Sequence, residues 1–247
     1  MHVMPVTISG VGGLPEIEAG TDLATAIIER AEMADGDIVV VTSKIVSKAE
    51  GRTVELDSVT PSDFAEQWGA VWGKDPRVVE IVLRESKRVV RQIGPVLITE
   101  THHGFVCANA GVDQSSSGAS GRVVVLPLDP DGSARRMRTR FAELGVAVAV
   151  IISDTFGRPW REGQTDVAIG VAGLAPLTSY IGQVDPHGHE YSVQEVCVAD
   201  ELAGAAELVK GNTSRVPVAI IRGVAWEPDD EASMQPVIRD PSRDLFR

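Results

Sequence analysis

The stretch GVAVAVIISDTFGRPWREGQTDVAIGVAG, residues 145–173, decides the fold that we expect for this chain. It opens with an unbroken apolar run, Val146–Ile152, and this run predicts a buried strand. The sequence then turns polar at Asp154 and Thr155, and a glycine and a proline predict a loop before a second strand over Val167–Val171. A carboxylate and a hydroxyl at the end of a buried strand can hold a metal or a phosphate at a sheet edge. The same residues can also cap an ordinary turn, and both interpretations stay open at this point.

The composition limits the class of protein. At 247 residues and 43% hydrophobic content, the chain can bury a sizeable core, as one large domain or as two lobes. Its apolar runs are far shorter than the ~20 residues of a membrane span, and its start lacks a signal-peptide pattern. The two distant cysteines, Cys107 and Cys197, lead us to expect a reducing cytoplasm. A net charge of −12 argues against general nucleic-acid binding and means that bound phosphates need local cations.

Strand and helix patterns alternate along the chain and predict a mixed α/β architecture. Trp68 and Trp72 lie four positions apart in one expected helix, where core or interface anchors are favoured over a ligand platform. The expected strands are Val6–Val11, Ile38–Val41, Val96–Thr101, Phe105–Asn109, Val123–Leu128 and Val216–Ile221, and the expected helices run from Thr21 or Asp22 to about Met33, from Pro61, from Pro76 to about Arg88, after Asp129 and over Val198–Lys210.

Polar residues follow the expected strand Ile38–Val41 as well. Ser43, Lys44 and Lys48 come after it, and lysines beside serines are suited to contacting phosphates. The alternative is that both lysines lie on a solvated edge strand. Asp113 likewise follows an apolar strand, inside a glycine- and serine-rich loop of the kind that usually forms a mobile surface.

Two other motifs suggest sites, but one has the wrong residues for its pattern and the other stands among turn residues. Gly12 and Gly13 follow the first strand, but Pro15 stands where G-x-G-x-x-G needs its third glycine, and the chain has no Walker lysine motif. His187 and His189 would form a metal pair on one face of a strand, whereas the proline and glycine around them favour an exposed turn. We therefore expect a turn at the histidines.

Seven blocks, taken in order, resemble a known family. They are GLPEI at 13–17, TSKIVSKAEG at 42–51, NAGVDQS at 109–115, LPLDPDGSA at 126–134, IISDTFGRPWREG at 151–163, AIGVAG at 168–173 and VADELAGAAELVKG at 198–211. Through Gly223, nearly the whole chain resembles the coenzyme F420-0:L-glutamate ligases, the gamma-glutamyl ligases of deazaflavin biosynthesis. The block at 151–163 is the most specific of the seven.

The resemblance implies an α+β fold with mixed sheets, flanking helices and two lobes, assembled as an intertwined homodimer. It implies a catalytic unit over residues 1–223 and a C-terminal tail over residues 224–247. The implied reaction adds L-glutamate to F420-0, and gamma-linked glutamates to F420-1, with GTP as co-substrate, GDP as product and an acyl phosphate between them. The implied metal is Mg²⁺ or Mn²⁺, with two ions per site, and K⁺ is a further candidate. The expected partners are GTP, L-glutamate and F420-0, without nucleic acid or membrane.

The resemblance also assigns site residues. The family's metal ligands fall on Asp113, Asp154 and Thr155, and the two aspartates are the expected catalytic residues. The family's guanine-nucleotide contacts fall on Leu14, Pro15, Glu16, Ile17, Ser43, Lys44, Lys48 and Ser116. Two positions depart from the family pattern: many relatives have asparagine in place of Ser116, and archaeal relatives supply a metal-binding glutamate in the loop where this chain reads Lys210-Gly211-Asn212. A water or a substrate oxygen would then replace a ligand at Asn212.

The chemistry of the implied reaction agrees with these residue types. A carboxylate forms an amide only after activation, and its attack on the GTP γ-phosphate brings two anions together, so the protein must supply charge neutralisation. Aspartates are hard oxygen ligands for Mg²⁺ or Mn²⁺, and lysines hold phosphates as point charges. One alternative is a non-catalytic module that binds deazaflavin or nucleotide. Another is a metal phosphohydrolase, although the usual D-x-D pairing is missing.

Overall fold

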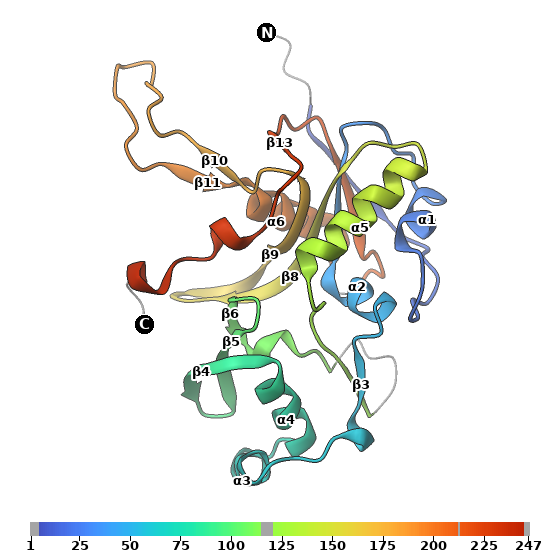
Figure 1. Cartoon of the computed structure of the whole chain (residues 1–247), viewed down its shortest axis with the longest axis vertical. Coiled ribbons are helices and arrows are strands. Elements are labelled where there is room, and N and C mark those ends of the chain that lie inside the picture. Colours follow the sequence, from blue (N-terminus) through green and yellow to red (C-terminus); the bar gives the residue numbers. More distant parts are fainter. Residues whose placement is uncertain (1–4, 115–120, 212, 245–247) are drawn as a thin grey trace.

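The computed structural model describes residues 5–114, 121–211 and 213–244. Its larger lobe is built on a mixed sheet with the strand order β1-β12-β2-β8-β9-β13 (Figure 1). In this sheet β2 and β8 pair in parallel, and the other described pairs are antiparallel. The strands are β1 (Thr7–Val11), β2 (Ile38–Thr42), β8 (Ala149–Arg158), β9 (Arg161–Leu174), β12 (Val218–Arg222) and β13 (Pro228–Asp229).

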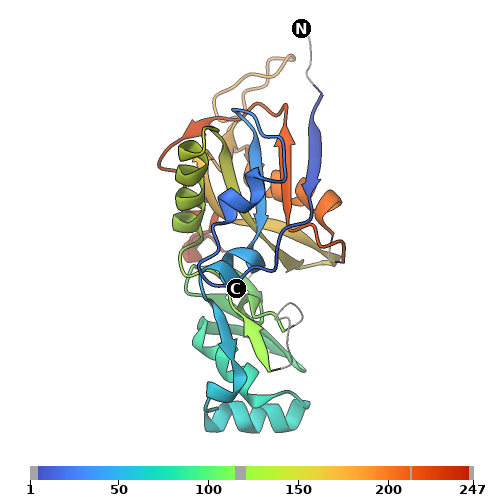
Figure 2. The same ribbon diagram turned by 90° about the vertical axis from the view of Figure 1, so that its right-hand side faces the viewer.

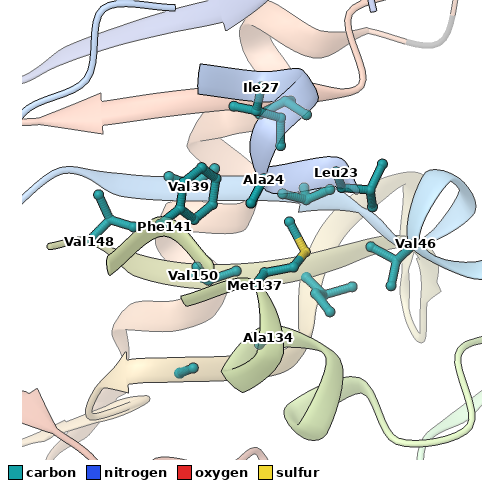
Figure 3. Packing of buried hydrophobic residues seen from close by; sticks show 14 of the residues in the cluster. Leu23, Ala24, Ile27, Val39, Val46, Ala134, Met137, Phe141, Val148 and Val150 are labelled. Atoms are coloured by element: carbon teal, nitrogen blue, oxygen red, sulfur yellow. The ribbon is translucent and has the colours of Figure 1, made fainter. Parts of the chain in front are cut away.

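Helices cover both faces of this sheet because its central strands are apolar on both sides. In β2, Val39 packs in the cluster that includes α1, α2 and α5, whereas Val40 packs in the cluster that includes α6. Figure 3 shows Phe141 of α5 beside Val39, and Figure 2 shows the sheet between α5 and α6. The helices of this lobe are α1 (Leu23–Ile28), α2 (Ser43–Ala49), α5 (Pro130–Glu143) and α6 (Val198–Lys210).

A smaller lobe lies below the sheet in Figures 1 and 2. Trp68 of α3 is 7% exposed in the core of this lobe, and it packs with residues of α4 and of the three-stranded sheet β4-β5-β6. Strands β3 and β7 pair with each other and join the two lobes. The elements are β3 (Thr53–Glu55), α3 (Asp63–Trp72), α4 (Pro76–Arg84), β4 (Ser86–Ile93), β5 (Val96–Thr101), β6 (Val106–Ala108) and β7 (Arg122–Val124), with short 3₁₀ turns η1 (Leu56–Ser58) and η2 (Asn109–Gly111).

This architecture confirms the expected mixed α+β class, with several sheets and flanking helices. The antiparallel pairing of β5 with β6 confirms the hairpin expected around residues 96–109. A separate two-stranded arm, β10 (Leu177–Ser179) with β11 (Glu195–Cys197), projects from the larger lobe (Figure 1). The intertwined homodimer stays a prediction.

The opening stretch differs from the expectation in one respect that matters for the site. The predicted loop after Thr155 is wrong, since β8 continues to Arg158 and turns tightly through Pro159 and Trp160 into β9. The polar residues stay in strand because β9 pairs with them and satisfies their backbone groups. A register shift between Ile152 and Ser153 marks a bulge at the point where the apolar run ends. Asp154 and Thr155 are therefore strand residues and do not cap a turn.

Other element boundaries also differ from the pattern. The edge-strand alternative for Lys44 and Lys48 is wrong, because both side chains lie on α2. Helix α1 ends at Ile28, short of the expected Met33. Helix α4 ends at Arg84, and the next residues form β4, which the pattern did not predict and which is held by pairing with β5.

The segment that follows β12 packs against the larger lobe. Strand β13 pairs with the end of β9, and Ala232 and Met234 are each 1% exposed in the core cluster on the α6 side of the sheet. Two short 3₁₀ turns, η3 (Gln235–Val237) and η4 (Pro241–Arg243), follow. No helix within the described ranges is long and apolar enough to cross a membrane.

Candidate active site

The parallel pairing of β2 with β8 brings two predicted site residues together. Thr42 is in register with Ser153, so the residues that follow each of them emerge at the same edge of the sheet. Ser43 begins α2 at that edge and is 2% exposed. Its hydroxyl donates a hydrogen bond of 2.8 Å to Oδ1 of Asp154 on β8. The candidate site is thus anchored at the end of the central strand pair.

Asp113 reaches the same region from the smaller lobe. Its backbone forms an isolated bridge with Val124, and it follows a turn in which Asn109 and Ala110 have φ values of 52° and 53°. Such left-handed backbone at non-glycine residues is uncommon and often occurs at functional sites. The Asp113 carboxylate lies 3.1 Å from the ammonium group of Lys44 on α2. One helix therefore contacts both predicted aspartates, through Ser43 and through Lys44.

Asp154 has an unusual electrostatic environment. Burial raises the pKa of its carboxyl from 3.8 to about 6. The hydrogen bond from Ser43 and the positive charge of Lys44 oppose this rise, while the negative charge of Asp166 adds to it. A cation placed beside Asp154 would favour the ionised form, so the site is prepared for positive charge.

Thr155 points away from Asp154, because consecutive strand residues face opposite sides of a sheet. Its hydroxyl donates a hydrogen bond of 2.7 Å to Oδ1 of Asp166, which lies directly opposite on β9. Oδ2 of Asp166 accepts hydrogen bonds from Ser153 at 2.9 Å and from Lys210 at 2.7 Å. The two predicted metal ligands of β8 therefore face opposite sides of the sheet, Asp154 toward α2 and Thr155 toward α6.

The sequence interpretation missed Asp166 and Lys210. They are 3% and 2% exposed, and their ion pair joins β9 to the end of α6. A signal for Lys210 was present, since it follows Leu202 and Ala206 on the inward stripe of α6 at helical spacing. Glu207 lies nearby, with an oxygen 3.9 Å from the Lys210 ammonium. Burial and the negative charge of Asp166 raise the pKa of the Glu207 carboxyl, and the positive charges of Lys210 and Lys44 oppose that rise.

The remaining predicted nucleotide residues lie along the loop after β1 and on α2. Lys48 forms an ion pair of 2.8 Å with Glu16, and the lysine side chain is 17% exposed against 77% for the glutamate. Pro15 is also exposed, whereas Leu14 is half-buried and Ile17 is packed in the core. The side chain of Ile17 thus faces the interior, and a ligand would meet the backbone there. Ser116 and Asn212 lie outside the described residues.

The two predicted aspartate ligands fit a metal site whose shell is completed by waters and substrate. Within the part of the chain that the structure describes, no three His, Cys, Asp or Glu side chains lie close enough to hold an ion by themselves. The expected turn is confirmed at His187 and His189, whose backbone amides donate to Asp185. Mg²⁺ usually takes one or two carboxylates and completes its shell with waters and substrate phosphates. Asp113 and Asp154 suit that arrangement, and they do not form an all-protein cage.

Comparison with known proteins connects this geometry to a family. A family model described as F420-0:gamma-glutamyl ligase matches residues 12–223. The chain belongs to this family. The match includes every predicted site residue, from Leu14 to Thr155, and also Asp166 and Lys210.

Relatives of similar length agree with the family match. A coenzyme F420:L-glutamate ligase of Methanopyrus kandleri is 46% identical over 96% of this chain and 100% of its own length. Proteins of the same name from Methanothermobacter thermautotrophicus and Archaeoglobus fulgidus are 44% and 41% identical, each over 99% of this chain, and over 100% and 97% of their own lengths. The resemblance found in the seven sequence blocks is thereby confirmed at the level of the family.

Proposed function

We propose that this protein is a GTP-dependent ligase that adds L-glutamate to coenzyme F420-0, and further glutamates by gamma linkage to F420-1. The observation that carries the proposal is the meeting of Ser43 and Lys44 with Asp113 and Asp154 where the two lobes join. The names of the relatives supply the ligase activity and two of the substrates, F420 and L-glutamate. GTP, the metal and the acyl phosphate are parts of the proposal.

The proposed reaction has two steps. A carboxylate oxygen of F420-0 attacks the γ-phosphorus of GTP, a P–O bond to the β-phosphate breaks, and GDP leaves. The amino group of glutamate then attacks the acyl carbon, an amide bond forms, the amine loses a proton, and inorganic phosphate leaves with one oxygen of the original carboxylate. The first step opposes two anions, so its barrier depends on how well negative charge is neutralised.

Two lysines of α2 are placed to supply part of that neutralisation. Lys44 is held over Asp113 at 3.1 Å, and Lys48 is held by Glu16 at 2.8 Å. Because Asp113 and Glu16 are acidic, their ion pairs hold the two lysine ammonium groups in the candidate site before the nucleotide binds. When phosphates bind, they compete for these ammonium groups and displace the carboxylates as partners.

A divalent cation completes the proposal. Asp113 and Asp154 would hold it on the α2 side of β8, and Thr155 would serve a second cation position on the other side. When bound, the ion would neutralise phosphate charge and orient the γ-phosphate for in-line attack. Asp113, Asp154 and Thr155 contribute oxygens for this purpose, and Ser43 fixes the orientation of the Asp154 carboxylate through its hydrogen bond of 2.8 Å.

Incubation with GTP, Mn²⁺, L-glutamate and F420-0, followed by mass spectrometry, tests the proposal. We expect glutamylated F420 and one GDP for each glutamate added, with GDP release requiring both glutamate and F420-0. A non-catalytic binding module would bind nucleotide without forming either product. A metal phosphohydrolase would release phosphate without glutamate. Either of those outcomes contradicts the ligase proposal.

A further inference from the structure

Asp166 is the centre of a buried hydrogen-bond network beside the candidate site. Its Oδ1 accepts from the Thr155 hydroxyl at 2.7 Å, and its Oδ2 accepts from Ser153 at 2.9 Å and from Lys210 at 2.7 Å. The Lys210 ammonium group also donates to the Ser153 hydroxyl at 2.7 Å. The network therefore fixes three side chains of β8 and β9 from the end of α6.

Stability alone does not account for a lysine and an aspartate at this place. Both side chains are only 3% exposed, and removing two charges from water is costly. Replacing a buried ion pair by apolar residues of similar volume is often neutral or stabilising. Residues on either side, Ala168 in β9 and Ala206 in α6, are apolar and buried in the same layer. The pair interrupts this apolar layer beside Ser153 and Thr155.

The network determines which way the Thr155 hydroxyl faces. An ionised carboxylate only accepts hydrogen bonds, and a hydroxyl has a single proton to donate. Because the Thr155 proton is directed to Asp166, only lone pairs of its oxygen remain for a ligand. A hydroxyl in this state is an acceptor toward cations and a poor partner for a phosphate oxygen, which would need a donor.

We infer that Asp166 is a positioning residue that makes Thr155 an obligate oxygen acceptor, and that Lys210 holds Asp166 in the required orientation. The inference rests on the proposed function in one respect, since it takes the ligand of Thr155 to be the divalent cation of that proposal. Lys210 also balances the charge of Asp166, so the network orients the hydroxyl without adding net negative charge to the site. Neither residue needs to touch the reactants.

Direct Mn²⁺ binding tests the inference independently of turnover. The free Mn²⁺ signal in electron paramagnetic resonance is titrated with the full chain in the presence of GDP. In Asp166→Asn the amide oxygen must face the Lys210 ammonium group, which only donates, so the amide NH2 group faces Thr155 and the Thr155 hydroxyl turns its proton away from residue 166. We expect the Mn²⁺ affinity to fall about 10- to 100-fold. Thr155→Val should give a loss of similar size. The double variant should bind no worse than Thr155→Val, because both substitutions remove the same interaction.

Two controls separate positioning from folding. Asp166→Leu combined with Lys210→Met replaces the ion pair by apolar side chains, and we expect it to fold and still to lose Mn²⁺ affinity. Asp37→Asn weakens the ion pair of another buried aspartate, which directly precedes β2 and lies 2.7 Å from Arg222, and it should lower the melting temperature without changing Mn²⁺ affinity.

Specific outcomes would overturn the inference. They are an Mn²⁺ affinity of the Asp166 variants equal to wild type, additive losses in the Asp166→Asn, Thr155→Val double variant, or no Mn²⁺ binding by wild type. These outcomes are distinct from a failure of the proposed function, which would appear as absent glutamylated product from a wild-type protein that still binds Mn²⁺ with the predicted coupling.

Discussion

The Ser43 hydroxyl donates a hydrogen bond of 2.8 Å to Oδ1 of Asp154, and the two residues are 111 positions apart in the chain. The contact exists because β2 and β8 pair in parallel with Thr42 opposite Ser153. It places the first residue of α2 against a carboxylate whose pKa is raised by burial to about 6. The helix that carries Lys44 and Lys48 is thereby fixed to the strand that carries Asp154.

Asp154→Asn should abolish most of the ligase activity and keep the fold. The amide preserves the shape and can still accept from Ser43, but it removes the charge that would attract a cation. We expect kcat to fall by about 10²- to 10³-fold, the size of effect seen when one preorganised electrostatic group is lost. GDP release at saturating substrates measures this, with circular dichroism as the fold check. Asp63→Asn, at an exposed position on α3, is the matched control, and equal activity of the two variants would remove Asp154 from its proposed role.

The raised pKa of Asp154 predicts how the stability of the metal-free protein depends on pH. The carboxyl has a pKa of about 6 in the folded state against 3.8 ordinarily, so between these values the folded protein holds a proton that the unfolded chain has released. The free energy of unfolding should therefore fall as pH rises from about 4 to about 6, with a slope of at most about 1.4 kcal/mol per pH unit from this one group.

Urea unfolding in the presence of EDTA, compared between wild type and Asp154→Asn across this pH range, isolates that contribution. The difference between the two proteins should be largest above pH 6, with the variant the more stable. Ser43→Ala should extend the window to higher pH, because the Ser43 hydrogen bond lowers the pKa of Asp154 in the folded state. A pH-independent difference between wild type and Asp154→Asn would show that this carboxylate is ionised throughout the range.

Lys48→Ala should weaken GTP binding without unfolding the protein. The ion pair with Glu16 is solvent-facing on the glutamate side, at 77% exposure, and such pairs contribute about 0–1 kcal/mol to stability. Loss of a charged contact to phosphate costs about 1.5–3 kcal/mol, so the KM for GTP should rise about 10- to 100-fold. Lys87→Ala is the control, since Lys87 also pairs with a carboxylate, at 3.3 Å from Glu100 in the smaller lobe. A KM for GTP that is unchanged in Lys48→Ala, or equally raised in Lys87→Ala, would contradict the assignment.

Met234→Ala should destabilise the protein by about 2–5 kcal/mol, the usual cost of truncating a buried side chain. Met234 is 1% exposed and packs with Ala232 in the core layer under α6. Its neighbour Gln235 is exposed, and Gln235→Ala should change the free energy of unfolding by less than about 0.5 kcal/mol. Chemical denaturation measures both variants. Equal stability of the two would mean that the segment after β12 does not contribute to the core.

The sequence predicted the regular elements best where a single periodic pattern was strong. Val198–Lys210 was predicted with the bounds that the structure has, because its apolar stripe and terminal glycine are unambiguous. The continuation of β8 beyond Thr155 was not predictable from local residues, since glycine and polar side chains stay in strand only because β9 pairs with them. Strand β4 was not predicted either, because its mostly exposed residues stay in strand only through pairing with β5.

The candidate site was predictable in part. Ser43, Lys44, Asp113 and Asp154 were identified from residue type and family blocks, but their contacts depend on long-range pairing that no local pattern encodes. Separation of Asp154 from Thr155 onto two sides of β8 follows from the strand that the sequence interpretation ended too early. Asp166 was not predicted because it is a single carboxylate directly before the expected strand Val167–Val171, and its partner Lys210 lies 44 residues away.

The proposed reaction begins when the carboxylate of F420-0 attacks the γ-phosphate of GTP in this site. F420-0 labelled with ¹⁸O in both carboxylate oxygens, incubated with the protein, GTP, Mn²⁺ and L-glutamate, tests it most directly. We predict singly glutamylated F420 together with inorganic phosphate that carries one ¹⁸O for each amide bond formed at the F420-0 carboxylate, whereas any later gamma-linked addition releases unlabelled phosphate. Singly glutamylated F420 with unlabelled phosphate, or labelled F420-0 recovered unchanged, would contradict the ligase proposal.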